Sequence, residues 1–116
     1  MIIIAGIIDV PIETRDAVVA ESAALQKATR DDEPGCLAYC FAADPVVPGR
    51  IQVYELWTDA ASLEAHFQHP NYHNMRALLG ASGILAADNW KYRIDAKDPV
   101  YGADRVASAR FWSVGE

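Results

Sequence analysis

Apolar and polar residues follow two different periods along the chain, and these periods predict four strands and two helical regions. Short runs rich in Ile, Val, Tyr and Phe are typical of strands, whereas longer runs rich in Ala, Leu, Glu and Lys are typical of helices. Strands are expected at residues 2–10, 36–43, 50–58 and about 90–94. Helices are expected at 15–30 and, after an N-cap at Thr58 or Asp59, to about His69, with a second helical piece at 71–79.

Residues that disfavour regular structure separate these runs. Pro11 ends the first strand, and Thr14 is a candidate N-cap for the first helix, which is expected to end at the acidic segment 31–35. Segment 44–49 contains two prolines and a glycine and predicts a hairpin loop. Pro70 interrupts the second helical region because it lacks an N–H and clashes with the preceding turn. The order is β-α-β-β-α-β, which predicts an α+β fold of the ferredoxin-like kind.

Residues 1–94 hold this pattern and are expected to form one domain. Residues 95–116 follow as a C-terminal extension that contains Tyr101, Phe111 and Trp112. Because such aromatic side chains are not typical of a purely solvated tail, we expect the extension to pack on the domain or on a dimer partner.

The distribution of apolar residues also predicts how the elements pack. The first helix is expected to bury a stripe formed by Val18, Leu25 and Ala28, with further alanines beside it. The strand at 36–41 is apolar on both faces: Cys36, Ala38 and Cys40 on one, and Leu37, Tyr39 and Phe41 on the other. Two helices cover only one face of a four-stranded sheet, so the other face predicts a homodimer formed by a second copy.

Composition and charge narrow the class of protein. The 116 residues include 52% hydrophobic ones, which is enough for a core, and the formal net charge is −6. The acidic surplus and the lack of a basic run argue against binding to nucleic acid or to an anionic membrane surface. The apolar run that begins at Met1 has no basic region and is too short for a membrane span, so it predicts a buried strand.

The two cysteines, Cys36 and Cys40, are four positions apart on a predicted strand, a separation of roughly 13 Å. That distance is too long for a disulfide. We therefore expect free thiols that serve as small apolar core residues, and a reducing cytoplasm as the location.

A group of short motifs resembles the antibiotic biosynthesis monooxygenase family over about residues 2–94. The motifs are specific in combination: Glu33-Pro34-Gly35-Cys36-Leu37, Pro48-Gly49-Arg50, Tyr54-Glu55-x-Trp57, Ala61-x-Leu63-x-Ala65-His66 and Pro70-x-Tyr72. The resemblance implies a dimeric α+β barrel. It also implies oxidation of quinols or aromatic polyketides by molecular oxygen, without metal, flavin or haem. Isomerases of a phosphorylated signal and haem-degrading proteins share the family, so the resemblance constrains the fold more than the reaction.

The haem-degrading members of that family carry Asn, Trp and a haem-ligating His at three positions. Gly6, His66 and Arg76 stand at or near those positions in this chain. All three differ from the pattern, which argues against haem.

Cofactor-free oxygenation requires a base for a phenol or quinol, an apolar pocket, and a donor or cation near the developing negative charge. His66 is the candidate base, because a His titrates near neutrality; a structural His at the helix–sheet seam is the alternative. Glu55 shares a strand face with apolar residues and so requires a partner, either as an orienting group for His66 or an Arg, or as part of a structural ion pair.

Four further residues are candidates for contact with the substrate. Tyr54 and Trp57 are expected either to line the pocket or to fill the core. Tyr72 and Asn74 are expected either to donate hydrogen bonds to substrate oxygens or to lie on the exposed surface.

His66, His69 and His73 have the three- and four-residue spacings of one helical face, which a zinc site can use. Pro70 interrupts the helix between them, and no carboxylate or thiol completes a known spacing, so no metal is expected.

The sequence therefore predicts a cofactor-independent monooxygenase that uses O2 on a small aromatic or quinol-like substrate. Two alternatives stay open: an isomerase or lyase on a small oxygenated metabolite, and a non-catalytic module that binds an aromatic ligand.

Overall fold

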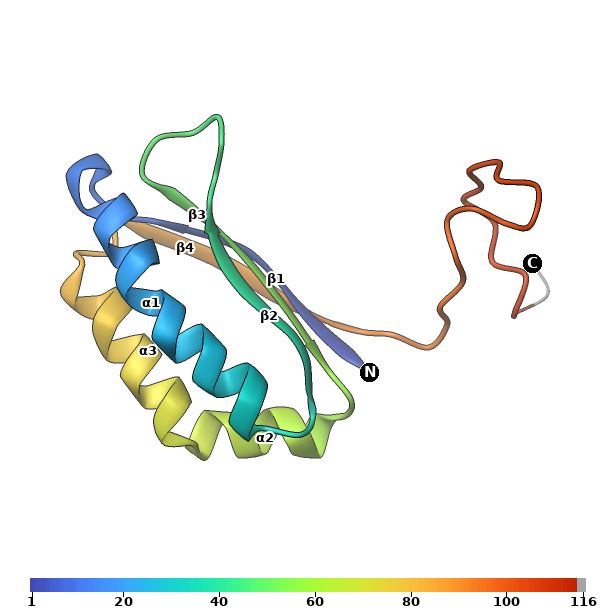
Figure 1. The fold of residues 1–116 in the computed structure, drawn as a ribbon, viewed down its shortest axis with the longest axis horizontal. Coiled ribbons are helices and arrows are strands. Elements are labelled where there is room, and N and C mark those ends of the chain that lie inside the picture. Colours follow the sequence, from blue (N-terminus) through green and yellow to red (C-terminus); the bar gives the residue numbers. More distant parts are fainter. Residues whose placement is uncertain (115–116) are drawn as a thin grey trace.

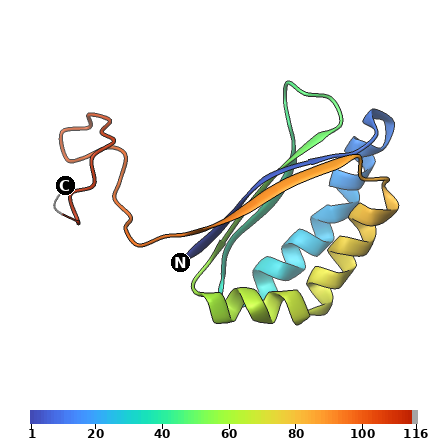
Figure 2. The ribbon, with the colours of Figure 1, turned by 180° about the vertical axis from the view of Figure 1, so that it is seen from behind.

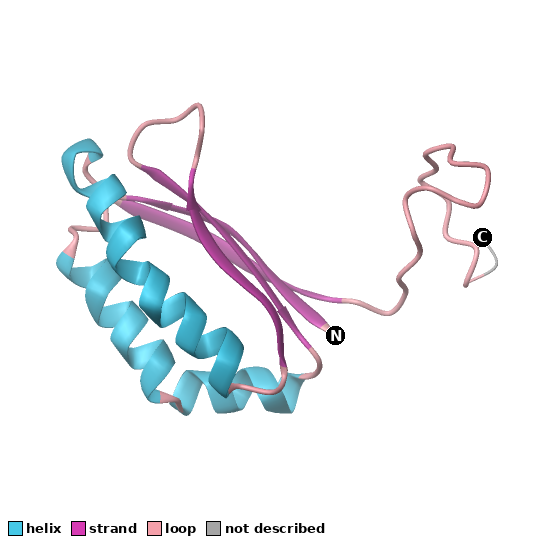
Figure 3. Ribbon diagram, viewed as in Figure 1, coloured by secondary structure: helices cyan, strands magenta, loops and turns pink. Residues whose placement is uncertain are grey.

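The computed structural model of the protein describes residues 1–114, and it consists of a four-stranded antiparallel sheet with three helices on one face (Figures 1 and 3). The sheet has the strand order β2-β3-β1-β4. The elements are β1 (Ile2–Asp9), α1 (Ile12–Asp32), β2 (Cys36–Ala43), β3 (Arg50–Trp57), α2 (Ala60–Gln68), α3 (Pro70–Ala81) and β4 (Ala86–Arg93). The predicted ferredoxin-like α+β fold is confirmed, with the second helical region divided at Pro70.

The first helix begins earlier than predicted. It starts at Ile12 after Pro11, and Thr14 does not cap it; instead, the Thr14 hydroxyl donates back to the Pro11 carbonyl at 3.0 Å. The φ of Pro11 is −54°, which already suits the entry into a helix. Pro11 therefore ends β1 and begins α1 without a side-chain cap.

The predicted apolar stripe of α1 is wrong in part, because the buried positions of the helix are Val18, Ser22, Gln26 and Thr29. The three polar residues are tolerated because each has a hydrogen-bond partner. The Gln26 amide donates to the Phe41 carbonyl at 2.9 Å and accepts from the Phe41 N–H at 3.0 Å. Helix α1 therefore satisfies polar groups on the open edge of β2 as well as covering the core.

The β2 strand has an irregularity that the sequence pattern did not predict. A register shift between Cys36 and Ala38 leaves Leu37 53% exposed, whereas Tyr39 and Phe41 are buried. The expectation that both cysteines are core residues is also wrong for Cys40, which is exposed. Cys36 is half-buried, and burial raises its pKa to about 11, so its thiol is protonated at neutral pH. Both thiols are free.

The two faces of the sheet differ. The inner face, toward the helices, carries the core residues Ile8, Val53 and Trp57. The outer face carries Tyr54, which is 42% exposed, and the even-numbered aromatic residues of β4. No helix covers that outer face in the part of the chain that the structure describes (Figure 2).

The C-terminal extension projects from the end of β4, away from the helical layer (Figures 1 and 2). It forms a turn of its own, closed by a bridge between Tyr101 and Ala107. Its large side chains are exposed, with Tyr101 at 64% and Trp112 at 45%. Residues 115–116 of the predicted extension lie outside the described residues. None of the helices within residues 1–114 is long and apolar enough to span a membrane.

Candidate active site

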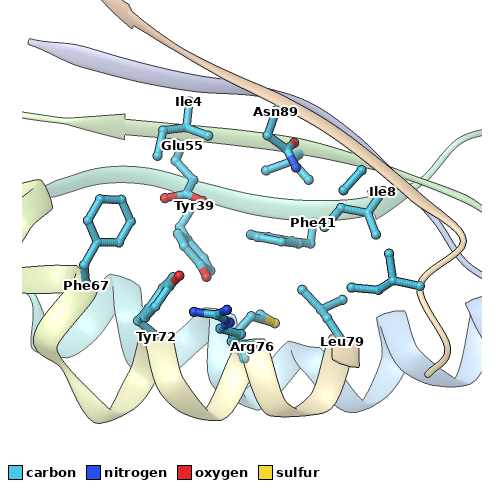
Figure 4. A pocket seen from close by; sticks show the side chains of 14 residues that line it. Ile4, Ile8, Tyr39, Phe41, Glu55, Phe67, Tyr72, Arg76, Leu79 and Asn89 are labelled. Atoms are coloured by element: carbon cyan, nitrogen blue, oxygen red, sulfur yellow. The ribbon is translucent and has the colours of Figure 1, made fainter. Parts of the chain in front are cut away.

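A cavity of about 380 Å³ lies between the inner face of the sheet and helices α2 and α3 (Figure 4). This size falls within the range of small-molecule sites. Its walls are mostly apolar and include two phenylalanines, and the apolar lining residues are Ile4, Ile8, Phe41, Val53, Phe67, Met75, Leu79, Ile84 and Ala87. An apolar chamber with aromatic walls suits a flat aromatic ligand.

Polar side chains reach this cavity from both of its walls. Tyr39 of β2, Glu55 of β3 and Asn89 of β4 come from the sheet, and Tyr72 and Arg76 come from α3 (Figure 4). Tyr72 and Arg76 are four positions apart, so they share one face of the helix. A few polar groups that converge in an apolar cavity are typical of a ligand site.

The carboxyl group of Glu55 lies on the sheet wall and is only 6% exposed. Its Oε1 accepts a hydrogen bond from the Trp57 indole N–H at 3.0 Å. Burial raises the pKa of Glu55 to about 7, and the negative charge of Glu33 acts in the same direction, while the Trp57 bond opposes both. A carboxylate with a pKa near neutrality is well matched to proton transfer at physiological pH.

Tyr39 is directly opposite Glu55 in the β2–β3 register and is 2% exposed. Burial and the nearby Glu55 charge raise the pKa of the Tyr39 phenol, so it stays protonated and acts as a donor. Neither its hydroxyl nor that of Tyr72 has a hydrogen-bond partner within residues 1–114. Both hydroxyls are therefore available to a bound molecule.

Behind this wall, a buried cluster joins the end of α1 to α2 and α3. The His66 Nδ1 lies 2.8 Å from Oε1 of Glu33, and the Asn71 amide donates to Oε2 of Glu33 at 3.2 Å. Burial lowers the pKa of His66, although the hydrogen bond to Glu33 opposes this effect. The imidazole is therefore neutral at physiological pH, and we assign the Nδ1 proton to the bond with Glu33.

Aromatic rings surround the His66 side chain, which is 1% exposed. The ring centroids of Trp57, Tyr72 and Tyr39 lie 4.6, 5.4 and 5.5 Å from that of His66. Tyr39 and Tyr72 line the cavity, whereas His66 does not. His66 thus supports the cavity wall from behind.

Gly35 explains why the Glu-Pro-Gly motif is needed at this place. A Cβ on Gly35 would lie 2.2 Å from the Ser62 Oγ, so only glycine fits against the start of α2. The Gly35 carbonyl accepts the Thr58 N–H at 3.0 Å. This close approach brings Glu33 to His66, so the first and fourth motifs of the sequence meet in one cluster.

The predicted site residues lie in different places. Glu55 and Tyr72 line the cavity, whereas Trp57 is fully buried and donates to Glu55. Tyr54 lies on the outer face, because alternate residues of β3 point to opposite faces. Asn74 is exposed and does not line the cavity.

Five further residues belong to the site but were not predicted from the sequence to do so: Glu33, Tyr39, Asn71, Arg76 and Asn89. For Glu33 the available signal was the motif that contains it. For Tyr39 the signal was its place beside Phe41 on the aromatic face of the predicted strand. For Arg76 the available signal was its place at or near a ligand position of the haem-degrading family members, whereas nothing in the sequence pattern distinguishes Asn89 from surface residues.

The three histidines of the second helical region do not come together. His69 accepts the Asn71 N–H at 3.0 Å as the N-cap of α3, His66 is bound to Glu33, and His73 is exposed. Among residues 1–114 no group of three or more His, Cys, Asp or Glu is placed to hold a metal ion.

Comparison with known proteins identifies the family. The model of the antibiotic biosynthesis monooxygenase family matches residues 1–78, and the chain belongs to this family. A curated relative, the uncharacterized protein sll1783 from Synechocystis, is 33% identical over 72 residues. That match covers 62% of this chain and 48% of the relative, so the chain spans about half of the relative's length.

Crystal structures show the same fold. A candidate antibiotic biosynthesis monooxygenase from Deinococcus radiodurans aligns with a TM-score of 0.72 at 20% identity, covering 88% of this chain and all of its own. One from Caulobacter crescentus aligns with a TM-score of 0.73 at 21% identity, covering 84% of this chain and 90% of its own. At these identities the likeness concerns the fold.

Proposed function

We propose that this protein is a cofactor-independent monooxygenase that oxidises a quinol or polycyclic phenol with O2. The observation that carries the proposal is the Glu55 carboxyl, which has a pKa of about 7 and lies in an apolar cavity with aromatic walls. Such a group can remove the proton of a phenol, while the apolar walls keep water away from the intermediates.

The proposed reaction begins with the removal of a proton from the substrate. The Glu55 carboxylate takes the proton of the substrate hydroxyl or of its tautomer, and the resulting anion gives one electron to O2. The substrate radical and superoxide combine, and a proton completes a hydroperoxide on a carbon that bears hydrogen. That carbon then loses its hydrogen as a proton while the O–O bond breaks. One oxygen atom stays in the product as a carbonyl, and the other leaves as water.

Hydrogen-bond donors complete the proposed site. The hydroxyls of Tyr39 and Tyr72 have no other partner within residues 1–114 and line the same cavity as Glu55. In this proposal they bind the substrate oxygen on which negative charge develops. His66 does not line the cavity, so we assign it a positioning role, in which it holds Tyr39 and Tyr72 through ring contacts.

We also propose that two copies pair through the outer face of the sheet. That face exposes Tyr54 at 42%, Trp90 at 63% and Tyr92 at 53%. Exposed aromatic residues gathered on one uncovered face are typical of an interface. The extension that begins at residue 95 starts beside this face, where Ile94 and Phe111 border a hollow with Tyr54. We propose that it packs on the domain or on the partner there.

Oxygen uptake tests the proposed activity. The purified, metal-stripped protein is mixed with a panel of hydroquinones and anthrone-like phenols, and autoxidation is subtracted. We expect enzyme-dependent uptake, and with ¹⁸O2 we expect one labelled atom in the product. Substrate conversion without oxygen uptake would instead indicate an isomerase or lyase. Binding without conversion of any panel member would indicate a ligand-binding module.

A further inference from the structure

Arg76 lines the cavity from α3, is itself exposed, and has no hydrogen-bond or ion-pair partner within residues 1–114. We propose that the substrate carries a carboxylate in addition to its phenol, and that Arg76 binds this carboxylate. This inference specifies the substrate class of the proposed oxygenase and rests on the assignment of this cavity as its active site. It concerns the binding of the substrate and not its turnover.

The charged groups of the cavity favour an anionic ligand. Glu55 and Arg76 are the two lining residues that carry a formal charge. They form no ion pair: Glu55 is bound to Trp57, and the described residues contain no hydrogen bond or ion pair of Arg76. A guanidinium stays charged at every physiological pH, while Glu55 is about half protonated near pH 7. The cavity thus holds a positive charge that an anionic ligand would neutralise.

The hydrogen-bonding groups point to the same class of ligand. Arg76 offers N–H donors only, the Tyr39 hydroxyl is held protonated, and Tyr72 and the Asn89 amide add further donors. Donors therefore exceed acceptors, and a ligand rich in oxygen satisfies them best. The planar fork of the guanidinium matches both oxygens of a carboxylate.

The geometry separates this subsite from the proposed base. Arg76 extends from α3, one turn after Tyr72, whereas Glu55 lies on the opposite, sheet wall (Figure 4). Asn89 lies over Gly6 on that wall, and a Cβ on Gly6 would be 2.5 Å from the Asn89 Oδ1. A flat substrate between the two walls can therefore place its phenol at Glu55 and its carboxylate at Arg76.

A second cation lies near the cavity on the β4 side. Lys91 pairs with Ile4 in the β1–β4 register, and Ile4 lines the cavity. Lys91 is exposed and shares the inner face with Asn89. Lys91 therefore adds a second cation on the β4 side of the cavity, which favours the approach of an anion from that side.

Binding without oxygen tests this inference independently of turnover. Two redox-stable probes, 6-hydroxy-2-naphthoate and 2-naphthol, differ only in the carboxylate and are titrated calorimetrically under nitrogen. We expect the wild type to bind the carboxylate probe at least about tenfold more tightly, as a charge-assisted pair does. Arg76→Gln should remove this preference and leave 2-naphthol within about twofold of its wild-type affinity.

Two further variants serve as controls. Arg93→Gln removes an exposed cation that does not line the cavity and should preserve the preference. Arg76→Lys keeps the charge but not the fork and should give an intermediate preference, and it serves if Arg76→Gln does not fold. Three results would overturn the inference: equal affinity of the wild type for both probes, a preference for the carboxylate probe that survives in Arg76→Gln, or no binding of either probe. A preserved wild-type preference together with absent oxygen uptake would reject the proposed activity alone.

Discussion

Glu33 and His66 are 33 positions apart in the chain, yet Oε1 of Glu33 lies 2.8 Å from Nδ1 of His66 in the interior. The same carboxylate accepts from Asn71, so one side chain joins the end of α1 to both α2 and α3. The rings of Tyr39 and Tyr72, which line the cavity, contact the His66 ring of this cluster. The Glu33 and His66 motifs therefore form a support for the site, whereas Glu55 and Tyr72 of two other motifs line the cavity itself.

A double-mutant cycle on this pair tests the cluster. Glu33→Gln and His66→Ala should each lower the free energy of unfolding by roughly 1–3 kcal/mol, because each leaves a buried polar partner unsatisfied. The double variant should lose less than the sum, with a coupling of about 0.5–3 kcal/mol. Urea unfolding at pH 7 measures all three values. Strict additivity would show that the two side chains do not interact.

Gly35 and Gly80 form a matched pair for packing. Gly35→Ala should destabilise the protein by about 1–3 kcal/mol, because the new Cβ would collide with the side chain of Ser62. Gly80→Ala should stabilise it by about 0.5–1 kcal/mol, because α3 gains a better helix former and nothing lies within 4 Å of the new Cβ. Thermal unfolding of the two variants should show shifts of opposite sign. A harmless Gly35→Ala would contradict the close approach of Gly35 to α2.

The raised pKa of Glu55 makes the folding stability depend on pH. The pKa is about 7 in the folded state, against an ordinary value of 4.5 for a solvated Glu, so folding favours the protonated carboxyl. Its stabilising contribution is complete below pH 4.5 and is lost as the pH rises through 7, by at most on the order of 3 kcal/mol. Glu55→Gln should remove this loss, so its stability relative to the wild type should grow between about pH 5 and pH 8. Parallel curves for the two proteins would show that Glu55 is not buried as a neutral acid.

The proposed pairing of two copies through the outer face has a direct test. Tyr54→Asp places a charge on that face, and Val46→Asp places one on the exposed β2–β3 loop, where Val46 is 82% exposed. We expect light scattering to give twice the chain mass for the wild type and Val46→Asp, and the monomer mass for Tyr54→Asp. A monomeric wild type at micromolar concentration would contradict the pairing.

The sequence predicted the elements that have strong local signals. Period-two alternation located β3 and placed Glu55 on the buried face, and Pro70 located the division between α2 and α3. The last strand was predicted too short, because its first residues, Ala86–Asn89, carry little β propensity and are held by pairing with β1. The polar face of α1 was not predicted, since Gln26 is buried only through its bonds to Phe41.

The site was harder to predict than the fold, because it depends on contacts between distant segments. Glu55 and Tyr72 were identified from residue type and position, and both line the cavity. Glu33 meets His66 only after α1, α2 and β2 have packed, and no local pattern indicates that contact. Arg76 matched a family ligand position only in place and not in residue type, and Asn89 has ordinary surface neighbours in the sequence. The face of α3 and the β1–β4 pairing bring the two residues to one cavity.

The pH dependence of oxygen uptake by the wild type and by Glu55→Gln tests the central claim most directly. With a substrate found in the panel, kcat/KM of the wild type should rise with pH through about 7, as Glu55 becomes ionised. Glu55→Gln should be about 10²–10⁴-fold slower and should lack this inflection, whereas His66→Ala should retain it because His66 does not contact the substrate. A Glu55→Gln variant with the wild-type rate and the same inflection would contradict the role of Glu55 as the base.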